Sequence, residues 1–529
     1  MFSATDIVNF LACRHLGVLE RDAAAGKREK PFFQDPSQEL LRELGIRHEQ
    51  NYLHHLGGDK SLAMVQIPEA LSWSEAVAET TKALHSKADV VYQGTLEDGT
   101  WGGRSDFLVK VEKPSALGSW SYEVVETKLA RSARANAVLQ LCFYSDILAK
   151  IQDVMPQRMH VVLGDSKVES FAVARYIAYF RKVRNDFLRA GPAPADTYPE
   201  PAELCRVCTW FPVCDEQRHI DDHLSLVAGI TRNQRKQLIS RDIQTLEALG
   251  TLKLPVLPKI ERIGEAALLR IHGQALIQRN GRNEGKTIYE ILEPIEEEKG
   301  FAALPNPSPG DIFLDFEGDN YAFGTGVEYL VGTLSVTDGP GKDPVYEARW
   351  SLAPFAEKQA FEEFIAKMLD RWLKFPDFHI YHYAPYEQMA IKQLAGRHGV
   401  CVDAVDRLLR AGIFVDLYRV TRQALRASVE SYSIKKLEPM YGFERAVPLR
   451  EARLALDAFS SIFALGTGEE ATAELLKTVE SYNKEDCLSA RRLRDWLEER
   501  RREMEQKLGR AIPRPARPRS PAWPARRAV

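Results

Sequence analysis

Asp106, Glu126 and Lys128 are the first residues along the chain whose types and spacing point to chemistry. They lie in two short apolar segments, residues 103–110 and 121–128, that are predicted to be neighbouring strands. Because side chains alternate along a strand, Glu126 and Lys128 project from one face, where Asp106 can reach them. Two carboxylates hold a divalent cation that polarises a phosphoryl oxygen and activates water, and a lysine orients that water or offsets developing charge. The arrangement predicts a site for metal-assisted hydrolysis.

Three further polar residues are candidates for the same site. Gln140 and Tyr144 are separated by one helical turn within an apolar helical pattern over residues 137–148, so both side chains are expected on one helix face. His48, in the sequence Gly45-Ile-Arg-His, is a candidate for an additional metal ligand. A single histidine at such a position has the alternative role of a packing or surface residue.

Four cysteines bracket these residues. Cys13 lies near the start of the chain, and Cys205, Cys208 and Cys214 form a CxxCx5C pattern. A metal or cluster held by all four would tie together the two ends of one domain, and four thiolates suit zinc or an iron–sulfur cluster equally well. The remaining cysteines are interpreted as small buried hydrophobic residues: Cys142, Cys401 and Cys487.

A second acidic pair lies in residues 311–318, which are predicted to form a strand. Alternation places the apolar side chains on one face and Asp315 and Glu317 on the other. Carboxylates on so hydrophobic a strand are costly unless they coordinate a cation or stay solvated at a sheet edge. The pair is therefore interpreted as metal-binding.

The partners of this pair are expected further along the chain. Tyr482 and Asp486 are one turn apart on a helix predicted to begin at residue 479. A tyrosine in that position can place a water beside metal ions, and two ions ~4 Å apart stabilise the attacking and leaving oxygens of a phosphodiester. A third acid is expected to be Glu387, after a strand and at the start of a helix; Asp416 is the competing choice, with an alternative role as a helix N-cap.

Composition limits the class of protein. The chain has 529 residues, of which 45% are hydrophobic and 27% charged, enough for two to four globular domains. The net charge of −3 gives no overall attraction to nucleic acid, so contacts must come from local patches such as residues 128–134 and 232–236. No signal peptide and no stretch of ~18 uncharged apolar residues is evident, which predicts a cytoplasmic protein with no membrane segment. In a reducing compartment, clustered cysteines favour metal binding over disulfides.

Composition also predicts domain limits. The Pro-containing segment 190–201 leads directly into the cysteine triplet, and an acidic, Pro-rich break spans residues 293–310. These features predict a first domain over residues 1–218, a helical segment over 219–295, and another domain over 300–510. The Arg/Pro/Ala-rich tail over residues 511–529 is predicted to be disordered.

The segment 219–295 contains helical patterns at residues 232–239 and 265–272, preceded by glycine turns at Gly229 and Gly264. This resembles a helix-hairpin-helix unit, which would present backbone amides to phosphate; a plain helical linker is the alternative. Residues 281–287, Gly-Arg-Asn-Glu-Gly-Lys-Thr, are one residue short of the nucleotide-binding pattern GxxxxGK[ST]. ATP hydrolysis by this chain alone is not expected.

The first set of residues resembles the RecB-type branch of the PD-(D/E)xK nucleases, in particular its iron–sulfur members. The resemblance rests on the cysteines, Gly45-x-x-His48, Asp106, Glu126-x-Lys128 and Gln140-x3-Tyr144. It implies a restriction-endonuclease-like α/β core and a Mg2+ or Mn2+ site that includes His48, Asp106 and Glu126. It also implies a [4Fe-4S] cluster on Cys13, Cys205, Cys208 and Cys214, with structural Zn2+ as the alternative.

The second set resembles the DEDDy class of RNase H-like 3'-5' exonucleases, specifically the YprB-like group. The Asp-x-Glu strand and the later Tyr-x3-Asp helix carry the resemblance. It implies an RNase H-like domain whose metal ligands are Asp315, Glu317, Glu387 and Asp486, with Tyr482 as a catalytic residue.

Both resemblances lead to one functional prediction. The chain is expected to be a metal-dependent nuclease that hydrolyses DNA at single-stranded ends, in DNA repair, recombination or defence. One alternative is a non-catalytic nucleic-acid-binding scaffold. Another is the nuclease half of a larger helicase–nuclease, with a helicase as partner.

Overall fold

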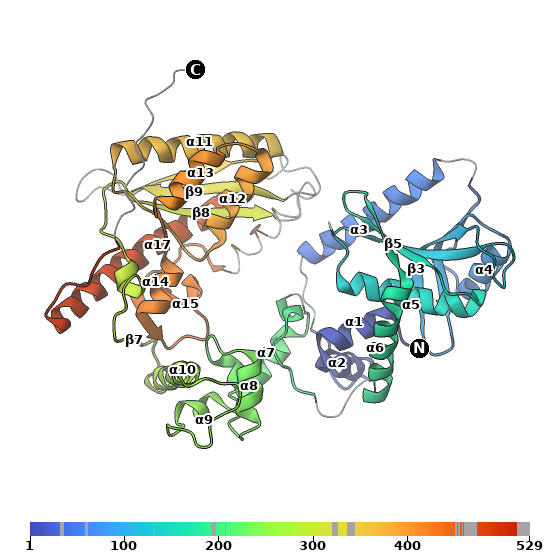
Figure 1. The fold of residues 1–529 in the computed structure, drawn as a ribbon, viewed down its shortest axis with the longest axis horizontal. Coiled ribbons are helices and arrows are strands. Elements are labelled where there is room, and N and C mark those ends of the chain that lie inside the picture. Colours follow the sequence, from blue (N-terminus) through green and yellow to red (C-terminus); the bar gives the residue numbers. More distant parts are fainter. Residues whose placement is uncertain are drawn as a thin grey trace. The chain divides into compact units, whose positions relative to one another are not determined.

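The computed structural model describes residues 1–31, 36–58, 62–130, 132–191, 197–206, 208–319, 326–335, 344–449, 452, 455–456, 459 and 473–515. The chain forms two compact units, Met1–Gln217 and Arg218–Val529 (Figure 1). Both are mixtures of helices and sheets, which confirms the predicted α/β class. Within the ranges described, no helix has the length and apolar character needed to span a membrane.

The N-terminal unit is built around a six-stranded mixed sheet with strand order β1-β2-β3-β4-β5-β6. Its strands are β1 (Met64–Gln66), β2 (Val90–Glu97), β3 (Gly102–Val111), β4 (Ser121–Lys128), β5 (Arg158–Leu163) and β6 (Val168–Ala172). β3 is antiparallel to both β2 and β4, whereas β4 runs parallel to β5. The strands predicted at residues 103–110 and 121–128 are therefore confirmed as adjacent strands of one sheet.

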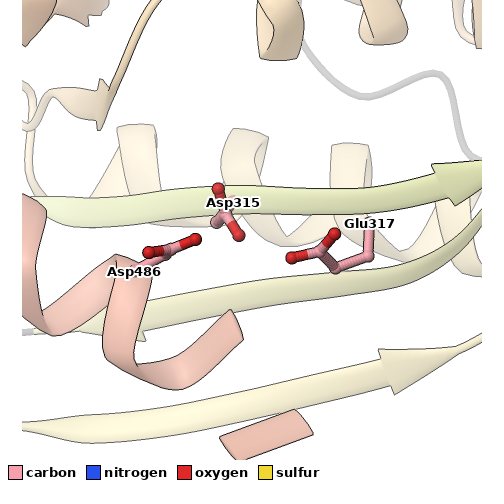
Figure 2. Close-up of side chains that lie close together, drawn as sticks. All are labelled: Asp315, Glu317 and Asp486. Carbon is pink, nitrogen blue, oxygen red and sulfur yellow. The ribbon is translucent and has the colours of Figure 1, made fainter. Parts of the chain in front are cut away.

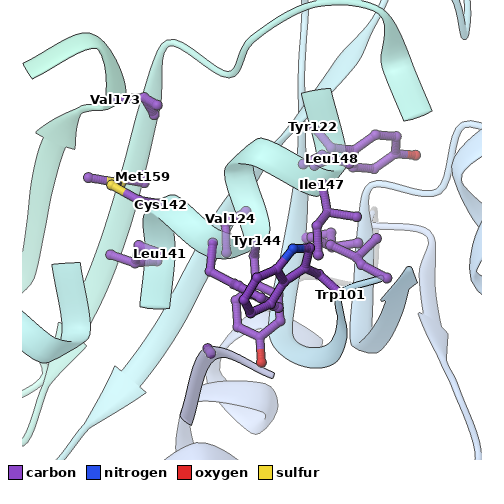
Figure 3. Packing of buried hydrophobic residues seen from close by; sticks show 14 of the residues in the cluster. Trp101, Tyr122, Val124, Leu141, Cys142, Tyr144, Ile147, Leu148, Met159 and Val173 are labelled. Atoms are coloured by element: carbon purple, nitrogen blue, oxygen red, sulfur yellow. Dashed lines mark hydrogen bonds between the residues drawn. The ribbon is translucent and has the colours of Figure 1, made fainter. Parts of the chain in front are cut away.

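Helices precede, separate and follow these strands along the chain, and the last of them continues past Gln217 into the C-terminal unit. They are α1 (Ala4–Ala12), α2 (Arg14–Ala24), α3 (Pro36–Gly57), α4 (Trp73–His85), α5 (Ala135–Gln152), α6 (Ile177–Ala190) and α7 (Phe211–Ile220), with short 3-10 turns η1 (Val173–Arg175) and η2 (Glu203–Arg206). α5, predicted at residues 137–148, packs Leu141, Ile147 and Leu148 into the core beside Tyr122 and Val124 of β4 (Figure 3). This packing fixes α5 against the strand that carries Glu126.

The C-terminal unit contains a five-stranded sheet with strand order β10-β9-β8-β11-β12 and a two-stranded sheet of β13 and β7. The strands are β7 (Tyr289–Ile291), β8 (Ile312–Asp319), β9 (Val327–Ser335), β10 (Val345–Trp350), β11 (Ile380–His382), β12 (Phe414–Asp416) and β13 (Leu425–Ala427). β8, β9 and β10 are antiparallel, and β8 runs parallel to β11, as does β12. The predicted strand over residues 311–318 is thus central in the larger sheet.

The helices of this unit fall into two groups: those from α11 onward pack against the larger sheet, whereas α8 and α9 share a separate core with the first half of α10 (Figure 1). They are α8 (Arg232–Ile239), α9 (Leu246–Gly250), α10 (Glu265–Glu284), α11 (Pro354–Lys374), α12 (Tyr386–His398), α13 (Val402–Arg410), α14 (Leu417–Ala424), α15 (Ile434–Tyr441) and α17 (Ala473–Leu508), with 3-10 turns η3 (Leu224–Leu226) and η4 (Gly300–Ala303). Ile312, Leu314 and Phe316 face α11, α12 and α13, as alternation predicts. Phe313 faces the opposite layer, where α17 packs.

Three predictions about the elements need correction. The helix predicted to begin at residue 479 begins at Ala473, because Leu475 and Leu476 pack with Val479 in a cluster against β9. The helices predicted at residues 232–239 and 265–272 exist, but α9 lies between them in sequence, so they are not joined directly by one hairpin. Cys401 is half-buried rather than buried, because it stands at the N-cap of α13, whereas Cys142 and Cys487 are buried.

The start of the predicted disordered tail is also wrong. Ile512 is buried in the core against α17, and the Arg514 guanidinium pairs with Glu498 of that helix. Ile512 and Arg514 are therefore packed against α17, one through apolar contact and the other through an ion pair. Residues 516–529 of the tail lie outside the described residues.

Candidate functional site

The sheet of the N-terminal unit brings Asp106, Glu126 and Lys128 together. The antiparallel register of β3 and β4 places Asp106 next to Glu126, and the Asp106 backbone N–H lies 3.3 Å from Glu126 Oε1. Lys128 Nζ lies 3.2 Å from Glu126 Oε2, and Gln140 of α5 donates to the same oxygen at 2.9 Å. Burial and the neighbouring Asp106 charge raise the pKa of Glu126 to about 8. A cation close to Glu126 would stabilise the ionised form of this buried carboxyl.

Asp106 and Tyr144 are held by backbone and side-chain contacts. Thr127 donates to Asp106 Oδ2 through its backbone N–H at 2.8 Å and its hydroxyl at 2.9 Å. Tyr144 donates to the Arg104 carbonyl at 2.7 Å, which anchors its ring beneath β3. Tyr144 therefore braces the strand that carries Asp106, while Gln140 reaches Glu126 directly.

His48 and its neighbour Glu49 lie in the second half of α3. His48 is buried, and its Nε2 lies 3.2 Å from the Val162 carbonyl of β5. Glu49, which the sequence reasoning missed, accepts a hydrogen bond from Gln93. Burial and then the Asp106 charge raise the pKa of Glu49, so this carboxylate also faces the site. The sequence offers one signal for Glu49, which directly follows the candidate metal ligand His48.

Three of the four cysteines of the predicted cluster share one small core, and Cys205 lies near Cys208. Cys13, Cys208 and Cys214 pack against the same small core of Leu16, Leu19 and Trp210. Burial raises the pKa of the Cys208 thiol, and the neighbouring Cys205 and Cys13 raise it further. The cysteine sulfurs do not form one of the compact donor groups found among the described residues, so the metal or cluster stays a prediction.

In the C-terminal unit, three carboxylates converge beneath the larger sheet. β8 directs Asp315 and Glu317 to one face, and α17 contributes Asp486 (Figure 2). One oxygen from each lies within 4.8 Å of the others, the only such group of three His, Cys, Asp or Glu donors among the described residues. Oxygen donors in this arrangement suit a hard divalent cation such as Mg2+ or Mn2+.

Each carboxylate of the acidic cluster makes ionisation of its neighbours less favourable. Burial, followed by the charges of Asp486 and Glu317, raises the pKa of Asp315 well above its ordinary range. Burial and Asp486 likewise raise the pKa of Glu317 to about 8. A divalent cation would relieve both effects, so the donor set fits a metal site.

Two cations lie next to Asp486, and the sequence reasoning identified neither. Lys435 Nζ of α15 lies 2.9 Å from Asp486 Oδ2, and Arg445 Nη2 lies 2.6 Å from Oδ1. Lys435 Nζ is 5.2 Å and Arg445 Cζ is 5.5 Å from the centroid of the Tyr482 ring. Burial and Asp486 raise the pKa of Tyr482 to about 12, so its hydroxyl stays protonated near neutral pH.

Asn483 connects α17 to Asp315. Its Nδ2 donates to Asp315 Oδ2 at 2.8 Å, and its Oδ1 accepts from the Tyr346 hydroxyl at 2.9 Å. A Cβ at Gly332 of β9 would overlap Asn483 Oδ1, so the glycine lets the helix approach the sheet. Asn483 stands next to Tyr482, but nothing in its spacing distinguishes it from the other polar residues of α17.

Glu387 and Asp416 take different positions. Glu387 lies buried in the first turn of α12, where Pro385 rather than Glu387 is the N-cap; its Oε2 is 3.3 Å from His382 Nδ1. Its charge contributes to the raised pKa values of Asp315 and Glu317, so it faces the acidic cluster. Asp416 caps α14, accepting from the Tyr418 N–H at 2.9 Å. Glu387 therefore lies closer to the acidic cluster in its electrostatic influence than a capping residue would require, and its choice over Asp416 as the middle acid stays a prediction.

Comparison with known families identifies the fold around this cluster. Residues 312–498 match the model of the RNase_H superfamily. The chain carries an RNase H superfamily domain. A search of curated proteins gave no match.

The RNase H superfamily domain includes β8 at its start and most of α17 at its end, so it contains every residue of the acidic cluster. Domains of this superfamily are usually nucleases that use divalent metals such as Mg2+. The match therefore indicates a nuclease-like function with nucleic acid as substrate. The predicted RNase H-like domain at the second acidic set is confirmed.

Proposed function

We propose that the RNase H superfamily domain is a DEDDy-type 3'-5' exonuclease that hydrolyses phosphodiester bonds at single-stranded DNA ends. The observation that carries this proposal is the convergence of Asp315, Glu317 and Asp486, with Tyr482 one turn before Asp486. A tyrosine and three carboxylates in this order match the YprB-like pattern read from the sequence. The proposed roles follow from the contacts of each residue.

The carboxylates of Asp315, Glu317, Glu387 and Asp486 would hold Mg2+ or Mn2+. When bound, the cation supplies activation of water and stabilisation of charge on the phosphate. Tyr482 keeps its proton and so donates a hydrogen bond that orients the attacking water. Asn483 holds Asp315 in place through a hydrogen bond, and His382 Nδ1 lies 3.3 Å from Glu387 Oε2.

Lys435 gives the site a fixed positive charge. Its ammonium contacts Asp486 and lies over Tyr482, between the metal-binding acids and the proposed water-orienting group. Negative charge that develops on the phosphate during hydrolysis is stabilised by such a cation in a poorly solvated site.

For residues 1–218 we propose a second, RecB-like PD-(D/E)xK nuclease site. Asp106 and Glu126, with His48, would hold Mg2+ or Mn2+, and Lys128 would orient water. Gln140 positions the Glu126 carboxylate, and Tyr144 braces β3. Cys13, Cys205, Cys208 and Cys214 would hold a [4Fe-4S] cluster, or Zn2+, that stabilises this unit.

Residues 219–295, which contain α8, α9 and α10 rather than two helices joined by one hairpin, are proposed to bind DNA as a helical segment. Arg232 and Lys236 of α8 support this role because both side chains are exposed one turn apart. A protein with these parts would act in DNA repair, recombination or defence.

One observation favours a second candidate, a non-catalytic nucleic-acid-binding scaffold. Both carboxylate oxygens of Asp486 are paired with cations, Lys435 and Arg445. If those pairs persist when nucleic acid binds, they compete with a metal ion for Asp486.

The two candidates are separated by one assay. End-labelled single- and double-stranded DNA and RNA are incubated with Mg2+ or Mn2+ and wild type, Lys128→Ala or Asp315→Ala protein. A nuclease requires that wild type cleaves DNA and that each substitution removes part of the cleavage. Binding of the strands without cleavage supports the scaffold, and cleavage unaffected by either substitution contradicts both site assignments.

A further inference from the structure

Three arginines gather on the surface of the C-terminal unit, outside the acidic cluster. Arg270 belongs to α10, Arg422 to α14 and Arg426 to β13. A Cβ built on Gly229 would lie 3.1 Å from Arg422 Nη2 and 3.5 Å from Arg270 Nη1, so both guanidinium groups flank that glycine. Elements distant in sequence therefore bring like charges together.

The charge of this arginine cluster is only partly balanced. Arg426 pairs with Glu290 of β7. Within the described ranges, Arg270 and Arg422 form no ion pair with a carboxylate, and Arg270 makes only a 3.5 Å contact to the Gly229 carbonyl. The pKa of Arg270 is lowered, first by burial and then by the charges of Arg422 and Arg426. An anion placed between the guanidinium groups would remove this repulsion.

Arg422 is held in position before any ligand binds. Arg422 Cζ lies 4.3 Å from the centroid of the Tyr432 ring, and Tyr432 is fixed by hydrogen bonds to Gln274 and to the Ala427 N–H, both 2.9 Å. Gly229 adopts φ +75° in the turn before α8, a left-handed conformation that favours glycine. The missing side chain leaves room for both guanidinium groups.

The guanidinium groups of the arginine cluster favour phosphate as a ligand. Guanidinium groups bind phosphate oxygens through paired N–H donors, and two such groups facing one point match a phosphate better than a single carboxylate. Arg270 and the glycine turn are exposed, and Arg422 and Arg426 are half-buried, so a ligand can reach them from solvent.

We propose that Arg270 and Arg422, with Arg426 at the edge, bind a backbone phosphate of the nucleic acid strand that the RNase H superfamily domain processes. The proposal rests on the proposed function of that domain as a nuclease. Tyr432, on which Arg422 stacks, precedes Lys435 of the acidic cluster by three residues, so their Cα atoms are no more than ~11 Å apart. This short separation along the chain is what links the arginine cluster to a strand whose end lies at Asp315, Glu317 and Asp486.

The test measures binding of a fluorescent single-stranded oligonucleotide to the full chain in EDTA, over a series of salt concentrations. The variants are Arg270→Gln/Arg422→Gln and, as a matched control that also removes two positive charges, Arg349→Gln/Arg410→Gln. In wild type, Arg349 and Arg410 are exposed and paired with Glu363 and Asp406. Melting curves confirm that each variant folds, and Arg270→Lys/Arg422→Lys keeps the charge without the planar donors.

The first variant should bind the strand about tenfold or more weakly, because charge-assisted hydrogen bonds are lost. Its slope of log affinity against log salt should fall by roughly 0.7 for each phosphate contact removed. The lysine variant should recover the slope but only part of the affinity, and the control variant should bind like wild type.

Two results would contradict the role of the arginine cluster and leave the proposed nuclease function intact. If Arg270→Gln/Arg422→Gln binds and cleaves strands like wild type, the arginine cluster has no role while the nuclease assignment stands. If inorganic phosphate stabilises wild type but not this variant, and oligonucleotide affinity is the same in both, the ligand is free phosphate. Failure of wild type to bind any strand defeats the proposed function and this inference together.

Discussion

Glu317 shows how a buried carboxylate makes stability depend on pH. Its pKa in the folded state is about 8, above the ordinary 4.5. A carboxyl whose folded pKa is raised stabilises the protein fully below its unfolded pKa, and this contribution is lost as pH rises through the folded value. We therefore expect the melting temperature of metal-free protein to fall between pH about 5 and about 9.

The Glu317→Gln variant should show a shallower fall over the same range, because it cannot ionise. Melting curves in EDTA, followed by circular dichroism, measure this, and Mn2+ should raise the melting temperature of wild type more at high pH than at low pH. Equal pH dependence in wild type and variant would contradict the raised pKa.

Lys435 is predicted to have opposite effects on metal binding and on cleavage. Lys435→Met removes a positive charge beside Asp486, so Mn2+ affinity measured by calorimetry should increase. The rate of cleavage should fall about tenfold to a hundredfold, because the charge that offsets the developing negative charge is lost. Lys436→Met, which changes the exposed neighbouring lysine, should alter neither quantity. If Lys435→Met instead binds Mn2+ more weakly than wild type, the lysine does not act through its charge beside Asp486, and its role is to support folding of the site.

The acids of the candidate site were predictable from sequence, but their cationic partners were not. Asp315 and Glu317 share a strand and Tyr482 and Asp486 share a helix, so local periodicity places each pair. Lys435 meets Asp486 only through the packing of α15 against α17, a contact with no periodic signal in the chain. The same holds for Glu49, which faces Asp106 from a helix far away in sequence.

At the scale of elements, the close approach of β9 and α17 depends on Gly332. In Gly332→Ala the new methyl group overlaps the buried Asn483 side chain, which must move away from Asp315. We expect destabilisation of about 1–3 kcal/mol, the usual cost of an overfilled core, together with slower cleavage. Denaturant unfolding and the nuclease assay measure the two effects.

The control is Gly396→Ala, at an exposed helix position where an added Cβ meets nothing, and which should be neutral or slightly stabilising. Adding Asn483→Ala to Gly332→Ala should restore part of the stability, because it empties the overlapping space. If Gly332→Ala and Gly396→Ala have the same free energy of unfolding, the stability of the protein does not depend on the close approach of β9 and α17.

Element positions were predicted better than their arrangement. β3, β4 and β8 were each predicted to within one residue at either end, because two-residue alternation and flanking turns are local signals. The early start of α17 and the packing of Ile512 depend on apolar partners supplied by other elements. The order of the strands in both sheets is likewise a tertiary property.

At the scale of the whole molecule, each compact unit carries its own group of acids. If the four cysteines hold an iron–sulfur cluster, anaerobically purified protein should absorb visible light, and Cys208→Ser should abolish that absorbance. Because the cysteines pack within the N-terminal unit, the variant should lose cleavage by that unit and keep cleavage by the RNase H superfamily domain. A colourless, zinc-containing wild type would favour structural Zn2+.

The most direct test of the central claim isolates the RNase H superfamily domain inside the full chain. Lys128→Ala disables the N-terminal site, and the time course of single-stranded DNA labelled at either end is followed in Mn2+. We predict shortening from the 3' end that EDTA stops and that Lys128→Ala/Asp315→Asn slows by at least about 100-fold. Cleavage by the double variant at the rate of Lys128→Ala alone would contradict the assignment of Asp315, Glu317 and Asp486 as a nuclease site.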